Sequence, residues 1–155
     1  MAQFGFRDPL DLPHGWTPWI RACLLSADDV VIVATPDLTS LRNAKNIIEL
    51  VKNARPNDNP PRLVINQVGV PKRPEIPSKD FAETMGITPS AIVNFEPALF
   101  GQAANNGQMV IEVSPKAGVS EAVRRLCHTL TGRSVAANTK NSASIFSFLK
   151  GKKQA

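Results

Sequence analysis

The chain has 155 residues, of which 43% are hydrophobic and 20% charged, a composition typical of one globular domain. This excludes a wholly disordered chain, and no apolar stretch approaches the roughly 18–20 residues of a transmembrane helix. Two cysteines are too few for a disulfide framework, and the first ten residues lack the basic start and apolar run of a secretory signal. We therefore expect a cytoplasmic protein.

The net charge of +5 is concentrated at the C-terminus. The last 22 residues contain four lysines and no acidic residue, so the rest of the chain is close to neutral. A nucleic-acid-binding domain has a broad basic face, and we expect no nucleic-acid partner. The expected organisation is one folded domain over residues 1–133 and a flexible basic tail over residues 134–155.

The first expected helix begins with Thr17 as N-cap and Pro18 in its first turn, and it continues to about Ser26. Its apolar side chains are expected to be buried: Trp19, Ile20, Cys23 and Leu24.

Residues 30–34 form an unbroken apolar run, which predicts a strand covered on both faces. The next helix is capped by Asp37 or Thr39. Its apolar stripe has helical spacing: Leu41, Ala44, Ile48 and Val51. Residues 63–65 predict a second buried strand, which ends at Asn66.

Prolines recur every three residues after this strand, which predicts an extended polyproline-like segment. They are Pro71, Pro74 and Pro77. Ser78 is expected to cap a helix that runs through Met85 and stops at Gly86. A third strand is expected over residues 91–95 and a short helix over residues 98–106.

The last helix is expected to begin at Ser114 and Pro115 and to end at Gly132. Its apolar stripe is Val119, Ala122, Val123, Leu126, Cys127 and Leu130. Strands thus alternate with helices three times, which predicts an α/β fold with a partial parallel sheet flanked by helices. Three strands are fewer than the usual number of about 4–6, and we expect that N-terminal strands of the complete fold are missing.

Four stretches of the sequence resemble the CpaE/TadZ pilus-assembly proteins, a branch of the MinD/ParA-like P-loop ATPases. They are residues 11–19, 27–46, 64–69 and 100–107. The second and fourth stretches are the most specific, because they contain polar residues that packing alone does not require. The resemblance implies the C-terminal half of a MinD/ParA-like fold.

The resemblance further implies binding of ATP and Mg, face-to-face pairing into a homodimer, and a role in the assembly and polar localisation of tight-adherence (Flp-type) pili beside a secretion ATPase. The family's phosphate loop, G-x-x-x-x-G-K-[ST], does not occur in these residues. We therefore expect a C-terminal portion, a fragment that does not bind or hydrolyse ATP alone. The alternative is a stand-alone interaction module without nucleotide.

Several positions match functional residues of the family. By this resemblance, Asp11 matches the acidic residue near the metal and the attacking water, and Asn66 the residue that hydrogen-bonds adenine. Phe95 and Pro97 match the loop that lines the base pocket. The alternative for each is a structural turn or core residue.

Two further surfaces are expected to contact partners. Arg42 and Lys45 lie on one flank of the helix after residue 37 and would face a full-length homologue or a pilus or secretion protein, unless that flank is only solvated. Ile145–Lys153 has the pattern of a weak membrane anchor, with a disordered basic tail as the alternative. The two histidines and two cysteines are too scattered for a metal site.

Overall fold

The computed structural model describes residues 8–13 and 15–132. The predicted tail over residues 134–155, with Ile145–Lys153, lies outside these described residues. The elements follow in the order α1 (Pro18–Ser26), β1 (Val31–Ala34), α2 (Leu38–Ala54), β2 (Arg62–Val68), α3 (Ser78–Met85), β3 (Ala91–Asn94), α4 (Pro97–Asn106), α5 (Val110–Val113) and α6 (Gly118–Thr131).

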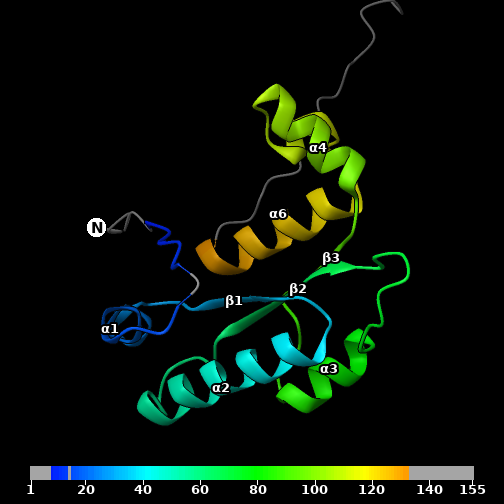
Figure 1. Cartoon of the computed structure of the whole chain (residues 1–155). Coiled ribbons are helices and arrows are strands. Elements are labelled where there is room, and N and C mark those ends of the chain that lie inside the picture. The colour runs from blue at the N-terminus through cyan, green and yellow to red at the C-terminus, as the bar shows by residue number, and fades with distance from the viewer. Residues whose placement is uncertain (1–7, 14, 133–155) are drawn as a thin grey trace, which may run out of the picture.

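The three strands form one sheet in the order β1-β2-β3, and both pairs of neighbours are parallel. Helices α2 and α3 lie on one face of this sheet and α6 lies on the other (Figure 1). Because parallel neighbours need a crossover connection, each strand is followed by at least one helix. The predicted α/β class with a partial parallel sheet is therefore confirmed.

The larger core lies between the sheet and the pair α2 and α3. Side chains of α2 meet alternate residues of β1 and β2, and Phe81 of α3 is fully buried there. The predicted stripe of α2 is buried at all four positions. A smaller core joins Val119 and Ala122 of α6 to β2 and β3.

Helix boundaries follow local capping chemistry. The Thr17 side chain accepts a hydrogen bond from the Ile20 N–H, and Pro18 opens α1 as predicted. The predicted stops at Gly86 and Gly132 are also confirmed, since both glycines are left-handed, with φ of 60° and 65°.

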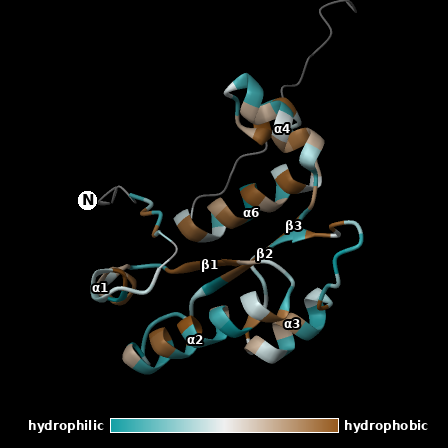
Figure 2. Ribbon diagram, in the orientation of Figure 1, coloured by the Kyte–Doolittle hydropathy of each residue, from teal (hydrophilic) through white to brown (hydrophobic). Residues whose placement is uncertain are grey.

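Burial differs from the prediction at several places. The predicted burial of four apolar side chains of α1 is confirmed only at Ile20: Cys23 and Leu24 are partly buried, and Trp19 is 57% exposed. Only one face of β1 is covered, and the other leaves Val31 and Val33 exposed, since α6 packs on β2 and β3. Strand β1 is hydrophobic throughout (Figure 2), although one of its faces is exposed.

The predicted stripe of α6 is buried only at Val119 and Ala122. Leu126 and Leu130 are partly buried, and Val123 and Cys127 are exposed, because they lie beside the face that packs on the sheet.

Three boundaries also differ. Strand β2 continues past Asn66 to Val68 through an irregular register. Ser78 is the first residue of α3 and makes no side-chain cap. Helix α6 begins at Gly118, because the Ala117 N–H first closes a turn on the carbonyl of Ser114 at 3.2 Å.

Candidate functional site

The carboxyl ends of the three strands are joined to one another by backbone hydrogen bonds. The N–H of Phe95, after β3, donates to the carbonyl of Val68 in β2 at 2.8 Å. The N–H of Ile76, in the loop after β2, donates to the carbonyl of Pro36, after β1, also at 2.8 Å. Ligands of open α/β sheets bind outside this edge, so its side chains are the candidates for a binding site.

Asn66 lies near the end of β2 and is half-buried. Its Oδ1 accepts a hydrogen bond from the N–H of Gln67 at 2.8 Å, and no hydrogen bond to another described residue engages its Nδ2. The register between β2 and β3 shifts between Ile65 and Val68, a bulge that changes the direction in which side chains point. Asn66 therefore presents an oriented amide donor at the carboxyl edge.

Phe95 and Pro97 come from the neighbouring strand end. Phe95 is 37% exposed, and Pro97 is the exposed first residue of α4. The backbone hydrogen bond from Phe95 to Val68 places this connection beside the end of β2. The structure thus places Asn66 and Phe95 on adjacent strand ends, and their matched roles in a base pocket stay a prediction.

The loop after β2 holds a compact polar cluster. The carboxylate of Glu75 accepts hydrogen bonds from the N–H groups of Gly69 and Val70 at 3.0–3.1 Å. It also accepts from Arg73 Nη2 at 2.8 Å and from Nε at 3.2 Å. These hydrogen bonds hold the pKa of Glu75 below its ordinary value. The bond from the Gly69 N–H has the largest effect, and the bond from the Arg73 side chain has the next largest.

This cluster was missed from the sequence. The regular spacing of Pro71, Pro74 and Pro77 predicted an extended segment, but Lys72 is left-handed, with φ of 63°. Gln67 is also left-handed, with φ of 55°. The pairing of Glu75 with two preceding backbone N–H groups depends on this turn, which the proline spacing does not reveal.

The N-terminus of α2 is filled by the chain's own carboxylate. Asp37 Oδ1 accepts the Ser40 N–H at 2.8 Å, and its Oδ2 accepts the hydroxyl of Thr35. Both hydrogen bonds lower the pKa of Asp37, and the one from the Ser40 N–H has the larger effect. Of the two predicted caps, Asp37 is therefore the one in place, and Thr39 is exposed.

Asp11 lies before α1 in a segment without helix or strand and is exposed. No hydrogen bond or ion pair to another described residue holds its carboxylate. The matched catalytic role of Asp11 stays a prediction.

Arg42 and Lys45 are exposed on α2. Lys45 Nζ lies 3.9 Å from Glu49 Oε1, with both side chains about half exposed to solvent, an arrangement usual for a solvated helix face. Contact of this flank with a partner also stays a prediction.

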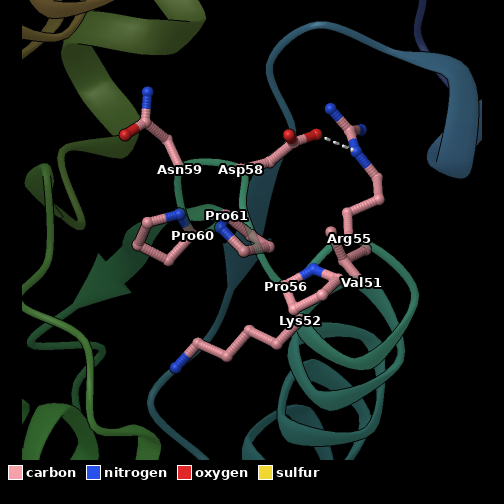
Figure 3. Close-up of a pocket in the computed structure, with 8 residues that line it drawn as sticks. All are labelled: Val51, Lys52, Arg55, Pro56, Asp58, Asn59, Pro60 and Pro61. Atoms are coloured by element: carbon pink, nitrogen blue, oxygen red, sulfur yellow. Dashed lines mark hydrogen bonds and ion pairs between the residues drawn. The ribbon is translucent and has the colours of Figure 1, made fainter.

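An open depression of about 370 Å³ lies at the opposite end of β2 (Figure 3). It is lined by Val51, Lys52, Arg55, Pro56, Asp58, Asn59, Pro60 and Pro61. Arg55 spans its rim, since Nε contacts Asp58 Oδ2 and Nη1 contacts the carbonyl of Ala27, each at 2.5 Å. We place the candidate site at the carboxyl edge instead, because none of the predicted residues lines this depression.

Within residues 8–13 and 15–132 there is no group of three or more histidine, cysteine, aspartate or glutamate side chains able to hold a metal ion. In the same part of the chain no helix has both the length and the apolar character needed to cross a bilayer.

The sequence is similar to the septum site-determining protein MinD of Bacillus subtilis (strain 168). The two are 27% identical over 129 residues, which cover 81% of this chain and 47% of MinD. The chain therefore spans about half the length of the curated relative that it matches. No protein-family model matches the sequence.

Solved structures show the same fold. MinD of Pyrococcus horikoshii OT3, complexed with Mg-ADP, matches with a TM-score of 0.65 at 18% identity, over 77% of this chain and 48% of that chain. A chain of the MinC:MinD cell division protein complex of Aquifex aeolicus matches with a TM-score of 0.56 at 23% identity, over 70% of this chain and 45% of that chain. A ParA family ATPase of Chlorobium tepidum TLS matches at 0.53 and 25%, over 64% and 42%. The chain has a MinD/ParA-type α/β fold.

Proposed function

We propose that the chain is a portion of a CpaE/TadZ-type ATPase that serves the assembly and polar localisation of tight-adherence pili. The observation that carries this proposal is the similarity to MinD over 129 residues in a sequence that contains no phosphate loop. Two of the stretches that resemble the CpaE/TadZ proteins reach the carboxyl edge: residues 64–69 include the end of β2, and residues 27–46 include the connection from β1 to α2. Residues 100–107 lie in α4 and at its C-terminal end.

The residues present fit the base of a nucleotide. Asn66 Nδ2 is a donor for a ring nitrogen of adenine, since its Oδ1 is occupied by the Gln67 N–H. Phe95 supplies an exposed aromatic ring on the adjacent strand end, and Pro97 continues that wall. This proposal assigns base recognition to the part of the ATPase that this chain represents.

The described residues do not fit the phosphates or the metal in the same way. A phosphate site uses free N–H groups at a helix N-terminus, but Asp37 already accepts the N–H of Ser40 at the start of α2. No Gly-rich loop with lysine accompanies it. We therefore propose no hydrolysis by this chain alone, and Asp11 would act only together with a phosphate loop.

The partners proposed are pilus or secretion proteins, or a full-length homologue that pairs face to face. One of the similar structures, from Aquifex aeolicus, is a complex of MinD with MinC, which supports a protein partner for this chain. Arg42 and Lys45 are the exposed cations that such a partner would meet on α2.

Calorimetric titration of the full chain with Mg-ATP tests this proposal. We expect no measurable heat at micromolar concentration, because the sequence contains no phosphate loop and Asp37 occupies the N-terminus of α2. Micromolar affinity would contradict the proposal that this chain alone does not bind ATP. The DNA upstream gives a second test. An open reading frame there that encodes a phosphate loop and continues into this chain would support the proposal that the chain is a portion of an ATPase.

The second candidate is a stand-alone interaction module, favoured by the exposed Val31 and Val33 of β1. An exposed apolar edge strand is a template for association. Sedimentation velocity of the wild type and of Val33→Lys would detect it. Association of the wild type that the lysine abolishes favours a module, whereas a monomer in both cases removes this candidate.

The proposed membrane contact of Ile145–Lys153 is tested by sedimentation with anionic liposomes. Removal of residues 140–155 is expected to lower the bound fraction, because the segment combines apolar residues with lysines. Equal partitioning of both forms would end the idea.

A further inference from the structure

Gln67 has a backbone conformation that is costly for its residue type. Its φ of 55° is left-handed, and Gln67 and Lys72 are the two non-glycine residues with positive φ in the described part of the chain. A left-handed backbone costs conformational energy for any residue with a Cβ. A non-glycine residue therefore keeps this conformation only where contacts with its surroundings hold it there. Gln67 directly follows Asn66 inside the irregular end of β2.

Arg73 is the side chain that holds Gln67. Its Nη2 donates to the backbone carbonyl of Gln67, and its Nη1 lies 3.4 Å from Gln67 Oε1. One planar guanidinium thus reaches both the backbone and the side chain of the left-handed residue. A lysine has no such fork of donors.

Glu75 in turn holds Arg73. The ion pair between Arg73 Nη2 and Glu75 Oε1 is 2.8 Å long, and the two side chains are only 24% and 19% exposed. The same carboxylate accepts the N–H groups of Gly69 and Val70. These charge-assisted hydrogen bonds join the loop into one unit, and they hold the pKa of Glu75 below its ordinary value.

The unit ends on the amide of Asn66. The Gln67 N–H, whose direction depends on the backbone that Arg73 holds, donates to Asn66 Oδ1 at 2.8 Å. That contact fixes which way Nδ2 points. The loop is anchored to the neighbouring strand ends through Ile76 to Pro36 and through Phe95 to Val68, so the amide is held relative to the whole edge.

We propose that Arg73 and Glu75 are positioning residues, which lock Gln67 in its left-handed conformation and thereby orient the Asn66 amide at the carboxyl edge. That this amide meets a nucleotide base rests on the proposed function. The positioning itself does not, and the two are tested separately.

The first test records the amide spectrum of the isotope-labelled full chain without ligand. Loss of the Asn66 side-chain signal in Asn66→Asp assigns it. In Glu75→Gln and in the milder Arg73→Lys, the signals of Gly69, Val70 and the Asn66 side chain are expected to shift, the last toward those of exposed asparagines. The matched control is Glu83→Gln, which breaks the exposed Lys79–Glu83 ion pair on α3 and should leave them in place.

A folded variant is recognised by unchanged core signals, such as those of Phe81. If Glu75→Gln does not fold, Arg73→Lys, which retains the positive charge, still tests the positioning role. An unmoved Asn66 amide in a folded variant would overturn the positioning role, because a merely structural loop would change stability without turning that amide.

The second test titrates the same proteins with adenosine at millimolar concentration. The wild type is expected to show shifts at Asn66 and Phe95, and either variant to bind about three- to tenfold more weakly, the loss of one hydrogen bond. Equal binding by variants and wild type would contradict the positioning. Absence of any shift in the wild type would contradict the proposed function and leave the first test to decide the positioning.

Discussion

The two faces of the sheet are covered over different strands. On each face, three side chains at matching register positions form a row across β1, β2 and β3, and helices cover only part of that row. On the α6 face, register neighbours Val33, Val64 and Ala91 are 62%, 5% and 7% exposed. On the face of α2 and α3, neighbours Ala34, Ile65 and Ile92 are 5%, 0% and 45% exposed. Each face therefore has one open end, at β1 in one case and at β3 in the other.

The difference shows that β2 is the only strand of the described sheet that helices cover on both faces. Strand β1 has an apolar sequence suited to full burial but lacks a helix on the α6 face. In the proposed ATPase, the open side of β1 is where further sheet and helix would pack. The chain by itself leaves Val31 and Val33 to solvent.

The largest expected effect separates the two isoleucines of one row. Ile65→Ala should lower the free energy of unfolding by about 2–5 kcal/mol, because it opens a cavity in a close-packed core. Ile92→Ala, the matched control on the same face, should cost less than about 1 kcal/mol. Urea denaturation measures both, and equal losses would show that Ile92 is covered in solution.

The valines of the other row give a smaller contrast. Val64→Ala should destabilise by about 2 kcal/mol through the loss of buried methyl groups, and Val33→Ala by less than about 0.5 kcal/mol. Urea midpoints of the two variants check this. A large effect at Val33 would mean that the α6 face extends over β1 or that copies associate there.

The smallest effect concerns the N-terminus of α2, which covers the buried face of β1. Asp37→Ala should cost about 1 kcal/mol at neutral pH, and Asp37→Asn a few tenths, since asparagine is also a good cap. The pKa of Asp37 is lower in the folded chain than its ordinary value of 3.8. Its stabilisation is therefore complete above that ordinary value and is lost as the pH falls through the folded pKa.

Unfolding measured from pH 7 to pH 2 checks the sign. The wild type should lose stability in acid more steeply than Asp37→Asn, which cannot titrate at this position. Parallel pH profiles would show that the carboxylate contributes nothing beyond an uncharged cap.

The sequence predicted the local elements of this fold well, because they depend on neighbouring residues. The Thr17 cap, the buried stripe of α2 and the left-handed stop at Gly86 follow from short-range chemistry. The openness of β1 did not follow, since an apolar run such as residues 30–34 states what a strand prefers and not which helix covers it.

The candidate site was predictable in part for the same reason. Asn66 and Phe95 were placed at strand ends by the resemblance and by the pattern of strands, and the structure brings those ends together. The cluster of Arg73 and Glu75 was missed, because its contacts depend on the positive φ of Gln67. Glycine or asparagine would have indicated a positive φ at this position, but glutamine does not.

We propose that this chain recognises the base of a nucleotide and not its phosphates. The direct measurement is a titration of the full chain with adenosine, AMP, ADP and Mg-ATP, followed through the Asn66 side-chain amide. We predict local shifts and dissociation constants that stay within a few-fold of one another along the series. A tenfold or greater gain with added phosphates would show that the chain binds them, and it would contradict this account.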